Sequence, residues 1–345
     1  MSIQNVANQA GVSVATVSRV FNLPDKVTDA TRQRVETIAK ALGYTPNASA
    51  RTLRTQRSRV LGVVLPTLLN PVFAECLDGI ASAATTAGYA ILPVTTDYEI
   101  AREDHAVNLL LAGNVDGMIL VVSNPATSQA LKRLKTAKSP YVLAYNRHAA
   151  HPCVSVDSEE AVIKLVVRLV KLGHSRITLV SGQLAASDRA QQRLRGFQKG
   201  AQAAGLKSAN VLEVPFVESA AQHISQQLVG KNRPTALICS NDLLAIRSIR
   251  AAHLTGLRVP KDLSVVGFDG IALGEDLTPM LSTITQPNAD MGRRATGLLV
   301  QALSGGKPLM PSASVTLSHG FREGESCARL ASDDTKNQKF SAKKT

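Results

Sequence analysis

Few side chains in this 345-residue sequence are spaced for catalysis or for metal binding. The sequence has no G-x-S-x-G nucleophile motif, no phosphate-binding Gly-Lys-Ser/Thr loop and no H-E-x-x-H zinc motif. The four cysteines are far apart, so we expect neither a disulfide framework nor a zinc site. His148 and His151 are close in sequence, but Pro152 follows them, and we interpret both as surface histidines of a loop. The sequence therefore predicts a protein that is not an enzyme and holds no metal or cofactor.

Three polar residues instead have the chemistry to bind a hydroxyl-rich ligand. Asp269 directly follows the apolar run 264–268, so it lies where a predicted strand ends, and Arg193 and Asn241 come from other segments. Aspartate accepts hydrogen bonds, arginine donates a fork of them, and asparagine does both. Each residue also has a structural interpretation, as a loop anchor or a helix cap.

The uneven distribution of charged residues along the chain indicates a second kind of binding. Residues 1–59 contain nine Lys/Arg and three Asp/Glu, a net charge of +6, out of +13 for the whole chain. A small basic segment on a nearly balanced body indicates a polyanionic partner. A membrane surface is the alternative, but this segment lacks the strong apolar face of an interfacial helix, which favours nucleic acid.

Three short helices are predicted in the first 45 residues of this segment. Apolar residues at helical spacing predict a helix over 3–10, which Gly11 ends, and Ser13 is a good N-cap for a second helix over 14–21. The tight turn between them makes a helix-turn-helix pattern. A third helix is predicted from Thr28 to Leu42.

Residues 46–59 have the composition of a linker. A short helical piece over 48–54 is expected, with Leu53 as the one large apolar side chain of a polar, basic stretch. Leu53 has few apolar neighbours in this segment with which to pack. Packing of Leu53 on the body is an alternative.

From residue 60 onwards, near-continuous apolar runs alternate with amphipathic windows. Parallel strands buried on both faces have this pattern, and the number of runs fits two doubly wound halves better than one sheet. Their carboxyl ends should then border a shared cleft. The predicted strands are 60–65, 89–95, 117–122, 141–145, 177–180, 211–216, 236–239 and 264–268, and helical windows include 73–87, 128–137, 159–172, 190–204 and 243–255.

Ordered motifs along this pattern resemble the LacI/GalR family of transcriptional regulators. Residues 3–22 (IQNVANQAGVSVATVSRVFN) resemble the family's DNA-binding headpiece, and residues 42–53 (LGYTPNASARTL) resemble its hinge. Further matches follow in family order at 70–75 (NPVFAE), 115–117 (VDG), 173–177 (GHSRI), 193–197 (RLRGF), 240–242 (SND), 256–260 (GLRVP) and 266–269 (VGFD). The resemblance implies an α/β chain with an N-terminal helix-turn-helix headpiece and a two-lobed, doubly wound body like that of periplasmic binding proteins.

The resemblance also implies DNA contacts. The arginine and the first two residues of the second helix would reach base edges: Arg19 suits guanine, and Val14 and Ala15 suit thymine methyl groups. Leu53 would wedge into the central base step from the minor groove, which is a known use of apolar side chains. The expected phosphate or groove contacts are Ser13, Thr16, Asn22, Arg51 and Arg54.

For the body, the resemblance implies that a small-molecule effector binds in the cleft. Arg147 together with Arg193 favours an acidic or phosphorylated ligand. Sugars, sugar acids and sugar phosphates are therefore the expected effector classes. The expected effector-binding residues are Asn70, Phe73, Ser123, Asn146, Arg147, Arg193, Phe216, Asn241, Asp269 and Gln286.

These inferences predict a repressor that binds a near-palindromic operator as a homodimer in the cytoplasm, with no membrane partner. We expect a headpiece over 1–45, a hinge over 46–59, a body over 60–327 and a disordered basic tail over 328–345, which has no leucine heptads for tetramer formation. A solute-binding protein is one rival, although the sequence lacks a signal-peptide pattern. A sugar-modifying α/β enzyme is another.

Overall fold

The computed structural model describes residues 1–45, 57–206, 209–216 and 219–330 of the chain. It divides into two compact units, Met1–Arg59 and Val60–Thr345, called here the headpiece and the body. The predicted helix that includes Arg51, Leu53 and Arg54 lies outside the described residues, so the roles expected for these three residues stay predictions.

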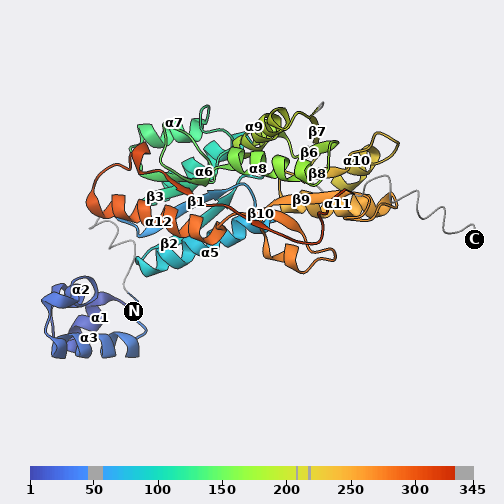
Figure 1. Cartoon of the computed structure of the whole chain (residues 1–345). Helices are drawn as coiled ribbons and strands as arrows, with labels where there is room; N and C mark the ends of the chain where they lie inside the picture. Colours follow the sequence, from blue (N-terminus) through green and yellow to red (C-terminus); the bar gives the residue numbers. More distant parts are fainter. Residues whose placement is uncertain (46–56, 207–208, 217–218, 331–345) are drawn as a thin grey trace, which may run out of the picture. The chain divides into compact units, whose positions relative to one another are not determined.

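In its described residues the headpiece has three helices: α1 (Ile3–Ala10), α2 (Val14–Asn22) and α3 (Asp29–Ala41), with a 3-10 turn at Pro24–Lys26 (Figure 1). Gly11 ends α1 with a φ of 62°, a conformation that glycine adopts without strain. Val6, Val17 and Val35, one from each helix, are fully buried together. The small core therefore fixes α2 against the other two helices.

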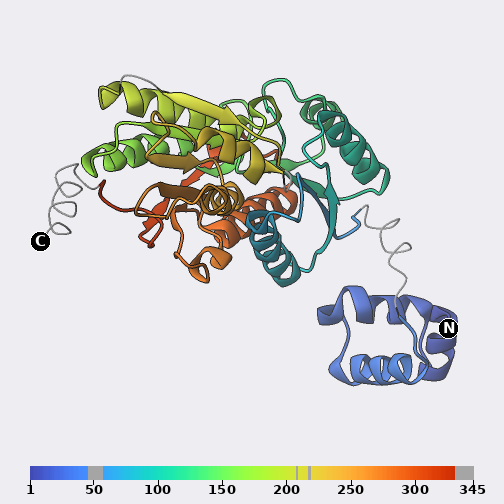
Figure 2. The ribbon, with the colours of Figure 1, turned by 90° about the vertical axis from the view of Figure 1, so that its right-hand side faces the viewer.

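The body has two lobes, each built on a six-stranded sheet (Figure 2). The sheet of the N-lobe has the order β11-β5-β4-β3-β1-β2, and all its pairs are parallel, as in Leu61 of β1 beside Gly117 of β3. Its strands are β1 (Val60–Leu65), β2 (Ala90–Thr95), β3 (Gly117–Leu120), β4 (Tyr141–Ala144), β5 (Cys153–Val156) and β11 (Val315–Leu317).

In the C-lobe the sheet has the order β12-β10-β9-β8-β6-β7, parallel except for β12, where Thr283 pairs antiparallel with Arg322. The chain passes between the lobes after β5, after β10 and after β11, so both lobes are built from distant segments. The strands are β6 (Ile177–Ser181), β7 (Asn210–Glu213), β8 (Ala236–Cys239), β9 (Ser264–Asp269), β10 (Ser282–Thr285) and β12 (Gly320–Arg322).

Helices cover both faces of each sheet, as near-continuous apolar strands require. One apolar cluster lies beneath α5 (Pro71–Thr86), α12 (Asn288–Gly305), α8 (Ser158–Lys171) and α9 (Asp188–Ala203). Two others lie beneath the remaining helices: α6 (Ile100–Ala112) and α7 (Gln129–Thr136) in the N-lobe, α10 (Ala220–Gln227) and α11 (Asp242–Leu254) in the C-lobe. No described helix has the length and apolar character needed to cross a membrane.

The predicted fold class is confirmed, and all eight predicted strands form, two of them with the predicted bounds. The prediction for 211–216 is wrong at its end, because β7 stops at Glu213, before Pro215, which has no N–H to donate. The expected tail is wrong at its start. Ala328 accepts a hydrogen bond from His174, and the Leu330 N–H donates to the Leu172 carbonyl, so the C-lobe holds 328–330.

Close packing of α5 on α12 generates a stability prediction. A Cβ at Gly292 would lie 2.1 Å from the carbonyl oxygen of Cys76 on α5, whereas a Cβ at Gly297 on the same helix meets nothing within 4 Å. Gly292→Ala should therefore lower the free energy of unfolding of the body by about 1–3 kcal/mol in urea denaturation. Gly297→Ala is the matched control and should be neutral or stabilising by up to about 1 kcal/mol, since alanine is the better helix former. Equal effects of the two substitutions would contradict this account.

Candidate functional site

Helix α2 presents two faces with opposite properties. Val17 and Val20 are buried in the headpiece core, while Ala15 and Arg19, one turn apart, are exposed together. No acidic residue lies in this helix. An exposed surface with a small apolar group and a guanidinium on a short helix can enter a DNA major groove.

The other described residues that are predicted to contact DNA also belong to α2 or cap it. The Ser13 Oγ accepts a hydrogen bond from the Thr16 N–H (3.1 Å), so it is the N-cap of α2, and it lies 2.9 Å from the Thr16 Oγ1. Val14 is half-buried against the headpiece core. Asn22 closes the last turn by donating to the Ser18 carbonyl at 2.6 Å. These side chains therefore shape the helix as well as its surface.

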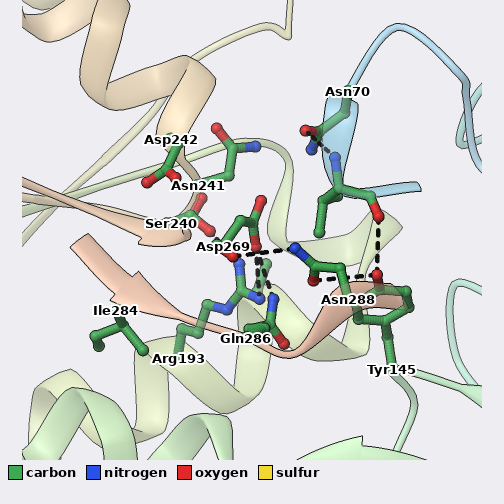
Figure 3. A network of polar contacts seen from close by, with 12 residues as sticks. Asn70, Tyr145, Arg193, Ser240, Asn241, Asp242, Asp269, Ile284, Gln286 and Asn288 are labelled. Carbon is green, nitrogen blue, oxygen red and sulfur yellow. Dashed lines mark hydrogen bonds and ion pairs between the residues drawn. The ribbon is translucent and has the colours of Figure 1, made fainter. Parts of the chain in front are cut away.

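A cavity between the two lobes collects side chains from the carboxyl ends of both sheets (Figure 3). The N-lobe supplies residues that follow β1, β2 and β4, and the C-lobe supplies α9 and the residues that end or follow β7, β8, β9 and β10. This is the edge at which doubly wound sheets place ligands. The cavity is lined by Asn70, Val72, Phe73, Tyr98, Tyr145, Ser187, Arg189, Ala190, Arg193, Phe216, Ser240, Asn241, Asp269 and Gln286.

Asp269 and Arg193 form a buried ion pair at the floor of this interlobe cavity. The Arg193 Nη2 lies 3.4 Å from the Asp269 Oδ1, its Nη1 donates to the Ser240 carbonyl, and its guanidinium carbon lies 3.6 Å from the centroid of the Phe268 ring. Gln286 donates to the same carboxylate oxygen at 2.9 Å. Burial raises the pKa of Asp269 to about 6, against the opposing effect of Arg193. Asp269 has a φ of 120°, and such backbone strain concentrates at functional sites.

Aromatic rings close the cavity from both lobes. Tyr98 follows β2 and stacks on Phe216, which follows β7, with ring centroids 5.3 Å apart and planes 8° apart. A Cβ at Gly182 would lie 1.9 Å from the Phe216 ring, so the glycine makes room for it. Phe73 packs edge-on against Tyr145 at 5.6 Å. Tyr145 in turn donates to the Val72 carbonyl and to the Asn288 Oδ1.

Seven of the ten residues predicted for effector binding line this cavity; the exceptions are Ser123, Asn146 and Arg147. Asn241 also caps α11, because its Oδ1 accepts from the Leu244 N–H at 2.8 Å. The seven are Asn70, Phe73, Arg193, Phe216, Asn241, Asp269 and Gln286.

Ser123 and Asn146 lie on a seam between the lobes. The Ser123 N–H and hydroxyl both donate to Glu103 at 2.6 Å, and its carbonyl accepts from the Asp188 N–H of the C-lobe. Asn146 donates to the Val122 carbonyl of its own lobe and to the Asp188 carboxylate. Both residues therefore join the lobes by hydrogen bonds.

Arg147 does not line this cavity; it is exposed and forms an ion pair with Asp157 at 2.5 Å. Arg147 and Arg193 therefore do not share one lining, and a role for Arg147 in effector binding stays a prediction. The second arginine of the cavity is Arg189, which donates to the Val122 carbonyl at 3.0 Å and to Asp188 at 3.1 Å. Sequence reasoning missed Arg189, although it shares a face of α9 with Arg193 at the i, i+4 spacing.

Comparison with known proteins covers both units. Residues 2–47 match the family described as bacterial regulatory proteins, lacI family, and residues 166–327 match the periplasmic binding protein-like domain. The chain is 33% identical over 324 residues to Catabolite control protein A of Priestia megaterium, covering 92% of this chain and 97% of that protein. It is also 33% identical over 310 residues to the HTH-type transcriptional repressor CytR of Escherichia coli K12, covering 88% and 90%.

Solved structures agree with these relatives. The Lac repressor dimer bound to operator and the anti-inducer ONPF matches with a TM-score of 0.83 at 28% identity, covering 96% of this chain and 99% of that one. A complex of the transcriptional regulator CelR with cellobiose matches with a TM-score of 0.69 at 26% identity, covering 94% and 99%.

The ion pair at the cavity floor generates a pH-dependent prediction. A buried carboxyl whose folded pKa is raised favours folding at acidic pH, and this stability is lost as the pH rises through the folded pKa. Arg193→Met removes the opposing charge, so the pKa of Asp269 should rise further. In urea denaturation the variant should lose about 3–5 kcal/mol at about pH 8 and clearly less at about pH 5.

Replacing both partners is the control for this experiment. Arg193→Met with Asp269→Asn leaves no charge to bury, so this site should add no pH dependence to the variant's own free energy of unfolding. A loss in the single variant that is independent of pH would show that packing, and not charge, holds this site together.

Proposed function

Because the chain belongs to the LacI family of bacterial DNA-binding regulators, we propose that it represses transcription as a homodimer on a near-palindromic operator. A small molecule bound in the interlobe cavity controls that binding. One observation carries this proposal. The same chain has a helix, α2, whose exposed face suits the major groove of DNA, and a cavity lined by polar side chains from both lobes. The cytoplasm is the compartment that such a function requires.

Several arguments support a dimer. One short helix reaches only a few base pairs, so two headpieces related by a two-fold axis are needed to read a specific site. The solved Lac repressor to which this chain is similar is a dimer on its operator. The expected wedge, Leu53, would act once from each subunit, with Arg51 and Arg54 beside it.

The effector that we propose is a sugar or a sugar derivative, including sugar acids and sugar phosphates. Carboxylate, guanidinium and amide groups surround the cavity, and aromatic rings lie beside them, a combination that suits a ring bearing hydroxyl groups. The related regulator CelR was solved with cellobiose. The free space is about 40 Å³, below the roughly 300 Å³ of a typical ligand site, so the cavity must widen to admit a sugar.

Selection of bound fragments from random DNA tests the DNA-binding part, and it should yield a near-palindrome. Arg19→Ala should then cost about 1–3 kcal/mol per half-site and flatten the preference at one base pair, because a bidentate contact to guanine is lost. Arg34→Ala removes one charge from the exposed part of α3 and should preserve the sequence preference. If Arg19→Ala weakens all sequences equally, Arg19 contacts phosphate and does not read a base.

A thermal-shift screen of sugars, sugar acids, sugar phosphates, nucleosides and purines tests the effector part, since a ligand of the folded state stabilises it by mass action. For a compound found in this way, Asp269→Asn should weaken binding about ten- to a hundredfold while operator binding persists. Arg147→Gln is the matched control, and it should bind the effector as the unmodified chain does. An unchanged affinity in Asp269→Asn would place the effector site outside the interlobe cavity.

A further inference from the structure

A second and larger cavity, of about 680 Å³, lies in the N-lobe at the opposite edge of its sheet. Its lining residues come from the end of α7, the start of β4, the end of α12 and the segment that follows α12. Since the interlobe cavity lies at the carboxyl ends of these parallel strands, this one lies at their amino ends. We call it the lysine-rimmed cavity.

The walls of the lysine-rimmed cavity are largely apolar. Leu134, Leu303 and Leu309 line it together with four proline residues and Tyr141. The Tyr141 ring is fixed by a 2.7 Å hydrogen bond between its hydroxyl and the Nδ1 of His151. His151, expected at the surface, is in fact only 5% exposed. This hollow has the size of a small-molecule site, whereas protein interiors are normally close-packed.

The charge around this cavity has one sign. Lys135, Lys138 and Lys307 are exposed at its rim, and no aspartate or glutamate lines it. The pKa of His151 is lowered to about 4, first by burial and then by the positive charges of Lys135 and His148. The region therefore has a positive potential that the residues lining the cavity do not neutralise.

Helix ends explain only part of this arrangement. Cations are favourable at the carboxyl ends of helices, and the three lysines are in the last turn of α7 or follow α7 or α12. That preference accounts for lysines near two helix ends. It does not account for an apolar hollow between the ends, or for the lack of an acidic side chain in its lining.

We propose that the lysine-rimmed cavity binds a small amphipathic anion, with a carboxylate or sulfonate held by the lysines and an apolar ring or short alkyl chain against the leucine and proline side chains. Because the two cavities lie at opposite edges of the N-lobe sheet, this ligand and the effector can bind at the same time. The site thus requires no effector and no operator DNA for its test.

The probe is 1-anilinonaphthalene-8-sulfonate, an aromatic sulfonate whose fluorescence rises in an apolar pocket, titrated into the full chain. We expect saturable binding that decanoate displaces and uncharged decanol does not. The variant with Lys135→Gln, Lys138→Gln and Lys307→Gln should bind about tenfold more weakly, as three partly screened ion pairs would predict. Ala302→Phe should also weaken binding, because it fills the hollow from α12.

The matched control removes the same charge elsewhere, with Lys132→Gln, Lys171→Gln and Lys231→Gln. These three lysines are exposed and do not line the cavity, so probe affinity should remain within twofold of the unmodified chain. Equal weakening in the two triple variants would overturn the proposal in favour of non-specific attraction. Unchanged binding in Ala302→Phe, or displacement by decanol as strong as by decanoate, would overturn it as well.

Discussion

The centre of the body depends on keeping one buried carboxylate paired. An ionised carboxylate removed from water is strongly unfavourable unless charge and hydrogen bonds replace the lost hydration. Asp269 obtains that replacement from Arg193 and Gln286, while Asn288 donates to its backbone carbonyl at 3.2 Å. These partners belong to α9, to the chain after β10 and to the start of α12. One carboxylate at the end of β9 therefore ties together segments that are distant in the sequence.

A second buried carboxylate, Asp188, has the corresponding role between the lobes. It lies at the start of α9 in the C-lobe, yet its main chain donates to Ser123 and its side chain accepts from Asn146, both of the N-lobe. Burial raises the pKa of Asp188, and Arg189 beside it opposes that rise. Since Arg189 also donates to the Val122 carbonyl, the contacts that join the lobes are continuous with the lining of the interlobe cavity. A ligand that contacts Arg189 thus acts directly on the seam.

Sequence patterns predicted the parts of this fold that repeat a simple physical rule. Apolar runs marked the buried parallel strands, and a polar residue after such a run, as at Asp269, marked the cavity edge. The prediction missed β10 because Ser282 and Thr283 look like surface residues. Both are buried, and the Thr283 hydroxyl donates to Asp242 at the start of α11, a pairing that no local pattern reveals.

The sequence also did not predict in which direction a side chain points when it follows a strand. Arg147 follows β4 as Asp269 ends β9, yet Arg147 turns outward to Asp157. Tyr145, two residues earlier, lines the interlobe cavity. Its φ is 64°, a backbone conformation that cannot be predicted from a tyrosine in the sequence.

The two cavities of the body differ most in their charge balance, and this difference bears on what each can bind. In and beside the interlobe cavity, Arg193 is matched by Asp269 and Arg189 by Asp188, so a ligand meets paired charges that offer both donors and acceptors. Such a lining discriminates by hydrogen-bond geometry, because a ligand that fails to satisfy a buried polar group leaves it unpaired. Arg147 is outside this lining, and the two arginines within it are already paired, so hydroxyl groups of a sugar suit its charge balance. Among the described residues, those lining the lysine-rimmed cavity supply cations and apolar walls but no acidic side chain, so there we expect the ligand itself to supply the negative charge.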